Sequence, residues 1–292
     1  MRGALLTLAV LVAACALAPF YAHLAGTNPF RTNVLGAVGG EAVLAEGPGG
    51  IGTIPIGPGW RAAYLLGADS LGRDVAARLL YGGRTSLLVA AGATLLCLLT
   101  GATAGLLAGA FGGLTDTVLS AGLDLLWAFP VTLLAISLSL VLVGAPLMLG
   151  PIVVREGSLA LPIIILGLVY APYVARPVRA ALVALRDSPF IEAARATGGG
   201  RLHVLRRHML PQLTPLLIGL APIVAAVALL TEAALSVLGL GVQAPGASWG
   251  TLIADGQGLL HQRPLVAIAP GVAVSATVLA LNALGEGLRE GR

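Results

Sequence analysis

The sequence contains no lysine: all 17 of its basic residues are arginine. A P-loop needs a lysine at the nucleotide phosphates, so this chain is not itself a Walker-type ATPase. Covalent catalysis through a lysine Schiff base is excluded on the same ground. If the protein uses the energy of ATP, another chain has to hydrolyse it.

Charge of either sign is scarce, at 10% of 292 residues, against about 25% in ordinary soluble domains. Hydrophobic residues make up 57%, and a soluble chain of this length would need more polar surface to cover its core. Aromatic residues are few, whereas the 40 glycines favour helices that pack closely in lipid. A net charge of +4 is too small to indicate nucleic acid as a partner. The composition predicts an integral membrane protein.

Only two cysteines are present, Cys15 and Cys97, and both fall within apolar runs. Neither their number nor their spacing fits a disulfide framework or a metal site. We therefore interpret both as small packing residues and expect the chain to bind no metal and no cofactor of its own.

Six apolar segments approach or exceed the roughly 20 helical residues that cross a bilayer. They predict an all-α membrane protein with about six transmembrane helices, at residues 4–25, 86–111, 118–147, 159–175, 213–240 and 265–284.

Three regions follow from these segments. Residues 1–25 are expected to form the first transmembrane helix. Residues 26–84 are expected to form an extracytoplasmic loop with an interfacial helix, irregular as far as about Gly67 because it is rich in Gly and Pro. Residues 85–292 would form a five-helix core that includes a polar cytoplasmic loop, 176–211.

The distribution of arginine orients the chain. Six spans place both termini on one side, and a cytoplasmic Met1 puts ten arginines inside and seven outside. The positive-inside rule therefore favours cytoplasmic termini. The first apolar run could instead be a cleaved signal, since Val12-Ala13-Ala14-Cys15 fits the small-residue pattern before a lipidated cysteine. The run over residues 4–25 is longer than the usual signal core of about 7–15 residues, so a retained helix is favoured.

The second span carries glycines at a strict spacing of four, which places them on one helix face. Such a face lets a neighbouring backbone approach closely and predicts helix packing. The residues are Gly101, Gly105, Gly109 and Gly113.

The polar segment predicts a helix–turn–helix. Ser188 can cap a first helix over 190–197, and Pro189 fits its first turn. Three glycines at 198–200 break it, and a second helix over 201–210 then stops at Pro211. A helix of small residues flanked by charge suits insertion into a groove of a soluble partner. A loop facing anionic lipid headgroups is the alternative.

Acidic residues at or inside the spans have two readings. Asp124 and Glu232 either line a transport pathway or hydrogen-bond neighbouring helix ends, because a charge inside a membrane is costly. Asp69, Arg73 and Asp74, just outside the second span, either contact a binding protein or gate, or form a helix end held by local ion pairs.

The polar segment resembles the EAA loop of ABC importer permeases. Glu192-Ala193-Ala194 is followed by Gly198, four residues after Ala194, and later by Leu210-Pro211. His208 stands where most of the family has an aliphatic residue, as is common in the peptide-permease branch.

Further motifs extend the resemblance over about residues 64–292, in the order typical of dipeptide, oligopeptide and nickel permeases. Residues 67–74 resemble the signature G-T-D-x-x-G-R-D, with Ala68 in place of Thr. The other matches are Arg84-Thr85-Ser86-Leu87, Phe111-Gly112-Gly113, Phe129-Pro130 after Asp124, residues 231–236, 238–243 and 248–250, and a closing motif of the C-type subunit at Asn282, Gly285, Gly287, Leu288 and Arg289.

The resemblance implies a type I ABC importer permease fold with a cytoplasmic EAA coupling helix–turn–helix. It implies a non-catalytic subunit for uptake of di- or oligopeptides, with nickel, glutathione or another small solute as alternatives. The implied partners are a second homologous permease subunit, two subunits that bind ATP and Mg, and an extracytoplasmic substrate-binding protein, at a bacterial or archaeal inner membrane. The coupling residues it implies are Glu192, Ala193, Ala194, Arg195, Gly198, Leu210 and Pro211.

Two other classes fit less well. An ion-driven secondary transporter would need paired broken helices, and no internal repeat links the two halves of the chain. A membrane-embedded enzyme would need a constellation such as H-E-x-x-H, which is missing from the sequence.

Overall fold

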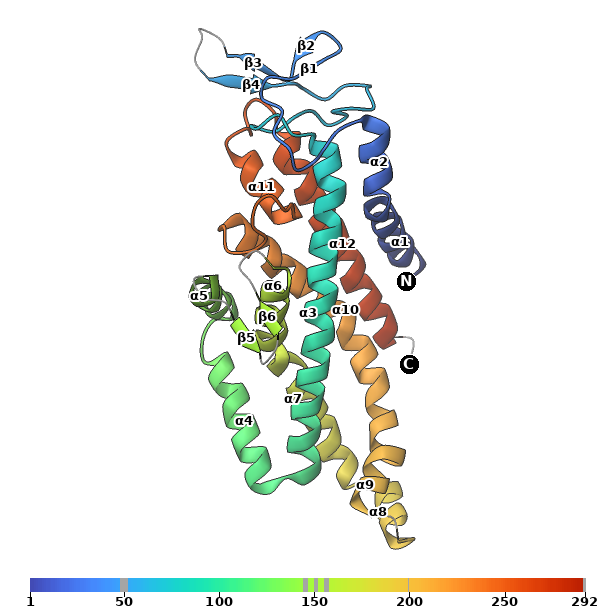
Figure 1. The fold of residues 1–292 in the computed structure, drawn as a ribbon. Coiled ribbons are helices and arrows are strands. Elements are labelled where there is room, and N and C mark those ends of the chain that lie inside the picture. The colour runs from blue at the N-terminus through green and yellow to red at the C-terminus, as the bar shows by residue number, and fades with distance from the viewer. Residues whose placement is uncertain (48–51, 144–146, 150–151, 155–157, 199, 291–292) are drawn as a thin grey trace.

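The computed structural model describes residues 1–47, 52–143, 147–149, 152–154, 158–198 and 200–290. Helices run along most of its length (Figure 1), with small strands at one end and α8 and α9 at the other. This arrangement confirms the prediction of a mostly helical membrane protein.

Four described helices are long and apolar enough to cross a membrane, and the number rises to six if each of two bent pairs counts as one span. The four are α3 (Val75–Phe111), α6 and α7 together (Ala160–Val169, Ala171–Arg186), α10 (Leu210–Val237) with the turns before it, and α12 (Leu265–Glu290). The bent pairs are α1 (Arg2–Ala16) with α2 (Ala18–Ala25), and α4 (Gly113–Trp127) with α5 (Val131–Val143). The upper number agrees with the prediction of about six spans.

The third apolar segment differs from its prediction as one tilted span. The chain bends by 87° between α4 and α5. Pro130 causes the break, because it has no N–H to donate to the preceding turn and disfavours helical backbone in the residue before it. Beyond α5, β5 (Leu147–Leu149) pairs antiparallel with β6 (Ile152–Val154).

The segment before α3 is more ordered than predicted. β1 (Ala37–Val38) pairs with β2 (Glu41–Ala42), and β3 (Leu44–Glu46) pairs with β4 (Thr53–Pro55). Its small core consists of Val43, Tyr64 and Ala68.

The structure corrects the prediction of a separate interfacial helix within residues 26–84. The described residues of 26–74 contain no helix, and residues 75–84 are the first turns of α3. The Asp74 carboxylate accepts hydrogen bonds from the backbone N–H groups of Ala76 and Ala77, at 2.9 and 3.2 Å. This cap starts the helix at Val75, eleven residues before the apolar run that begins at residue 86.

The polar segment also differs from its prediction in extent. Its first part, 176–186, is the end of α7, and α8 (Pro189–Ala196) follows. The second helix does not stop at Pro211: α9 (Arg201–Val204) continues through a π-helical turn at Leu205–Met209 into α10. The wider turn changes the hydrogen-bond pattern just before the proline, which lets the helix continue.

The glycine face of α3 packs against α7. A Cβ on Gly101, Gly105 or Gly109 would lie 2.5, 2.4 and 2.7 Å from the Ala171 carbonyl, the Ala175 carbonyl and the Leu182 Cβ, respectively. The backbones therefore approach more closely than any side chain would permit. Gly113 is the exception, because it begins α4 with φ +56° and has nothing within 4 Å of a Cβ. Its prediction as a packing residue is wrong.

Replacing Gly105 by alanine tests this contact. The added methyl would meet the Ala175 carbonyl, so we expect Gly105→Ala to lower the free energy of unfolding by about 1–3 kcal/mol. Gly271→Ala in α12 is the matched control, because nothing lies within 4 Å of its Cβ and alanine favours helix. Denaturant unfolding in detergent measures both. Equal midpoints for the two variants would contradict the close approach.

Candidate functional site

Helix α8 lies at the end of the molecule farthest from β1–β4 (Figure 1). Ser188 has extended backbone (φ −82°, ψ 142°), and Pro189 occupies the first turn. The Ser188 hydroxyl donates to the Leu185 carbonyl rather than capping α8, so that detail of the prediction is wrong. The helix ends before Gly198, whose φ of +87° is in the left-handed region that favours glycine.

One face of α8 anchors it and the other is free. Ile191 is fully buried and belongs to the main apolar cluster. Glu192, Ala193 and Arg195 are exposed, and Ala194 is half-buried. A short helix of eight residues is marginal alone, so Ile191 supplies the packing that holds it. The exposed face thus carries Glu192 and Ala193, whereas Ala194 packs against the apolar cluster and Arg195 follows Ile191 by one turn.

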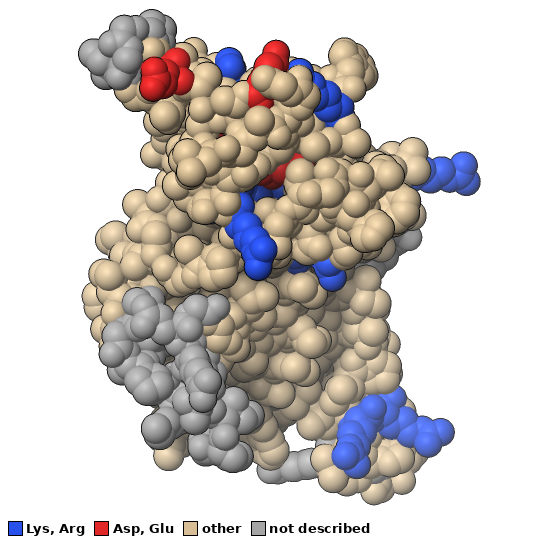
Figure 2. All heavy atoms as spheres, turned by 45° about the horizontal axis from the view of Figure 1, so that its top comes forward, with Lys and Arg blue, Asp and Glu red and all other residues tan. Residues whose placement is uncertain are grey.

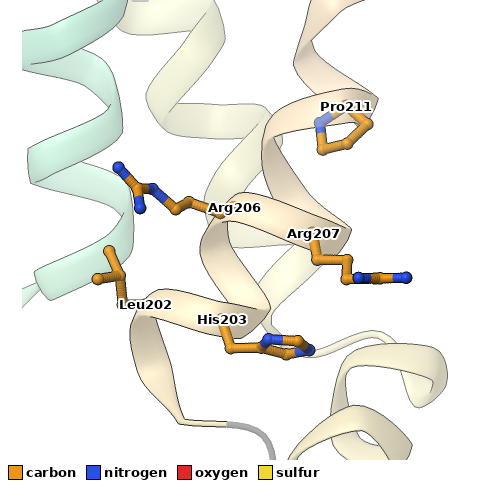
Figure 3. A pocket seen from close by; sticks show the side chains of 5 residues that line it. All are labelled: Leu202, His203, Arg206, Arg207 and Pro211. Carbon is orange, nitrogen blue, oxygen red and sulfur yellow. The ribbon is translucent and has the colours of Figure 1, made fainter.

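The start of α10 lies toward the same end of the molecule as α8 (Figure 1). Leu210 and Pro211 are both exposed. Pro211 borders an open groove of about 640 Å³, which is also lined by Leu202, His203, Arg206 and Arg207 (Figure 3). Figure 2 shows one group of arginines at this end of the molecule with no acidic side chain visible beside it, whereas the upper part of that view carries both arginines and acidic side chains. The structure thus brings both parts of the predicted coupling loop to one basic end.

Asp124 is on α4 and forms an ion pair with Arg176 of α7, with 2.7 Å between Oδ1 and a terminal nitrogen. The Arg176 guanidinium also stacks 4.2 Å from the centre of the Trp127 ring. Two turns away, Asp116 holds Arg179 through both carboxylate oxygens. These pairs join α4 to α7. The geometry supports the helix-contact reading of Asp124, although its carboxylate remains 66% exposed.

Glu232 of α10 is completely buried. Its carboxylate accepts hydrogen bonds from Ser86 Oγ of α3 at 2.8 Å and from Ser236 Oγ at 2.7 Å. Ser86 in turn accepts from the backbone N–H of Trp249, which begins α11 (Trp249–Gln257). A buried acid needs such partners, and here they connect three helices.

Asp69 and Arg73 belong to a buried cluster at the start of α3. Arg73 contacts Asp69 at 2.6 Å and Asp255 of α11 at 2.8 Å. Arg78 contacts the same Asp255 at 3.0 Å and donates to the Pro29 carbonyl at 3.1 Å. The cluster fastens the strand-bearing segment and α11 to the first turns of α3.

Asp74 is 1% exposed. Besides its capping bonds it accepts from the Tyr64 N–H and the Thr27 hydroxyl, each at 3.0 Å. Burial raises the pKa of its carboxyl above the usual value, and these hydrogen bonds offset only part of that rise. Its neighbours Asp69 and Arg73 are 1% and 8% exposed. So little exposed surface favours the helix-end reading over contact with a binding protein.

The sequence analysis missed several members of these clusters. Arg78, Asp255 and Arg179 lie at ends of apolar segments, and charges so placed are expected to have partners. That rule identifies candidates but not their pairing, because Arg78 and Asp255 are 177 residues apart. Both cysteines are free and buried. Within the described ranges, no three His, Cys, Asp or Glu side chains group as a metal site requires.

Removing Arg78 tests the buried cluster at the start of α3. Arg78→Met leaves the Pro29 carbonyl without its donor and Asp255 with Arg73 alone. Breaking a buried ion pair is costly, so we expect the free energy of unfolding to fall by about 3 kcal/mol. Arg84→Met on the same helix is the control, since Arg84 is exposed and should cost less than about 1 kcal/mol. Thermal unfolding in detergent compares them, and a similar loss in both would refute the clamp.

The chain is similar in sequence and fold to known proteins. The sequence model of the family described as "Binding-protein-dependent transport system inner membrane component" matches residues 101–290. A putative peptide transport system permease protein of Brucella suis is 39% identical over 228 residues, 78% of this chain and 72% of the relative. A dipeptide transport system permease protein of Alkalihalophilus pseudofirmus is 35% identical over 78% of this chain and 71% of its own.

Two further relatives complete the comparison. A glutathione transport system permease protein of Pectobacterium atrosepticum is 34% identical over 78% of this chain and 72% of its own. Among solved structures, the MetNI methionine ABC transporter in an inward-facing conformation aligns with a TM-score of 0.56 at 22% identity, covering 73% of this chain and 95% of that one. The fold is therefore that of a type I ABC importer permease. The chain belongs to the family of inner membrane components of binding-protein-dependent transport systems.

Proposed function

We propose that this chain is one of two homologous permease subunits of an ATP-driven importer, and that α8 is the helix that docks into an ATP-hydrolysing partner. The observation that carries the proposal is the division of α8 into an anchored and an exposed face. Ile191 is fully buried while Glu192 and Ala193 are exposed, in a chain of a family of importer permeases. Small residues between charges suit insertion into a groove.

Movement of α8 would reach the spans through its anchor. Ile191 shares one apolar cluster with Val204, Met209 and Leu213, which lie before and within α10. Packed interfaces respond to a displacement as a body rather than by gradual deformation. Closure of two partner subunits on ATP and Mg would therefore shift α8 and α10 together and reorient the pathway between the two permeases. This chain performs no covalent chemistry in the scheme.

The proposed cargo is a di- or oligopeptide, delivered by an extracytoplasmic binding protein. Two relatives are named for peptide or dipeptide transport and one for glutathione, which is itself a small peptide. We place the chain in the inner membrane with both termini and α8 in the cytoplasm. Met1 packs against Gly287 near the end of α12, and the seven arginines of 176–211 fit the positive-inside rule.

Variants of α8 test the docking role. Glu192→Lys reverses a charge on the exposed face, and Gly198→Val forces a β-branched residue into left-handed backbone. We expect each to reduce ATP-dependent transport at least tenfold while the permease still inserts and keeps its unfolding midpoint. Glu286→Lys is the control, because Glu286 is exposed on α12 rather than on α8. Normal transport and normal ATPase binding in both α8 variants would count against docking there.

The cargo has its own test. The permease pair, the ATPase subunits and the binding protein are reconstituted in vesicles, and uptake of a labelled dipeptide is measured with and without ATP. We expect uptake that requires both ATP and the binding protein and that excess unlabelled dipeptide abolishes. Uptake that persists on an ion gradient without ATP would instead indicate a secondary transporter. ATP-dependent uptake of glutathione without competition from dipeptides would narrow the cargo to that tripeptide.

A further inference from the structure

A second cavity, of about 500 Å³, lies where the ends of α3, α7 and α8 meet the turns before α10. Its lining is mostly apolar, with two basic side chains: Ala110, Phe111, Arg186, Arg195, Leu202, Val204, Leu205 and Met209. In Figure 3, Leu202 points toward the α3 side, whereas Arg207 points away from it.

The two arginines of this cavity differ from their neighbours in α7. Arg176 and Arg179 each have a carboxylate partner on α4. Arg186 and Arg195 have none within 4.0 Å among the described residues, and no acidic residue lines the cavity. Asp116 acts on Arg186 only through longer-range electrostatics. The cavity therefore carries uncompensated positive charge.

The floor of the cavity consists of buried apolar side chains. Val204 and Met209 are 2% and 4% exposed, and Phe111 is 59% exposed at the rim. A free phosphate would gain nothing from these surfaces. A molecule with an anionic head and a hydrocarbon tail would use both the guanidinium groups and the apolar wall.

The cavity also lies at the depth of lipid headgroups. Arg84 is exposed on α3, so it belongs at or outside the outer edge of the hydrocarbon. From there to Phe111 the helix rises roughly 40 Å, against a hydrocarbon thickness of about 30 Å. Phe111 thus reaches into the inner headgroup layer.

We propose that this cavity binds an anionic phospholipid, with the phosphate between Arg186 and Arg195 and an acyl chain along Phe111, Leu202 and Leu205. Basic pockets between helices on the cytoplasmic side suit such headgroups. Because Arg186 belongs to α7 and Arg195 to α8, one phosphate holds the short helix against the end of the span. The lipid is then part of the surface that positions α8.

Tryptophan quenching by brominated lipid measures occupancy. Phe111→Trp places a probe at the rim, and the same transporter complex with Phe111 retained supplies the background from native tryptophans. The complex is reconstituted with brominated phosphatidylglycerol or brominated phosphatidylcholine. Leu95→Trp, on the exposed middle of α3, is the control probe and should show no preference between the two lipids.

The expected preference for phosphatidylglycerol at the Phe111→Trp probe is roughly 30-fold, since each arginine near the headgroups contributes about a factor of 5. Arg186→Gln should reduce it about fivefold, and Arg186→Gln with Arg195→Gln should bring it close to parity. Arg207→Gln is the matched control, because Arg207 lines the other groove and should leave the preference intact.

Three results would overturn the proposal. Equal quenching by both lipids at the Phe111→Trp probe would mean that the cavity does not select charge. No quenching by either would mean that a protein surface covers it. Loss of the preference on adding inorganic phosphate would mean that a soluble anion, rather than a lipid, occupies the arginines.

Discussion

The close approach of α3 and α7 is the contact on which the rest of the molecule depends. In lipid, no hydrophobic force drives two helices together, so van der Waals contact between backbones has to do so. Gly101, Gly105 and Gly109 make this contact possible by leaving room for carbonyls and side chains of α7. Since α8 follows directly after α7, the glycine face of one span sets where α8 begins.

Charge is distributed differently at the two ends of this bundle. At the end that bears β1–β4, Arg73 and Arg78 share Asp255 in a buried cluster that fastens the strand-bearing segment to the helices. At the opposite end, Arg186 and Arg195 have no carboxylate partner within the described residues. Removing a buried charge from its partner is costly, so the first cluster holds its elements together. The charge at the opposite end is available to the lipid and the partner protein that we propose.

The buried Glu232 shows how a membrane protein can hold an acid through hydrogen bonds between helices. Its two serine partners come from α3 and α10, and Ser86 also receives the first N–H of α11. A hydrogen-bonded network of this kind specifies how helices meet, because leaving any member unpaired in a low dielectric is expensive. The network therefore fixes how α3, α10 and α11 meet, as the glycine face fixes how α3 meets α7.

Composition and local pattern determined the membrane class, the approximate spans, the existence of α8 and the glycine face, because apolar runs, capping residues and spacing are local properties. Local pattern failed at Pro130 and Pro211, two prolines with opposite outcomes: one bends the chain by 87°, and a π-helical turn carries the helix through the other. Only the structure decided how the chain runs at each proline, because the local rule allows a break at both. Only the tertiary structure decided the pairing of Arg78 with Asp255, because these residues lie 177 positions apart in the chain.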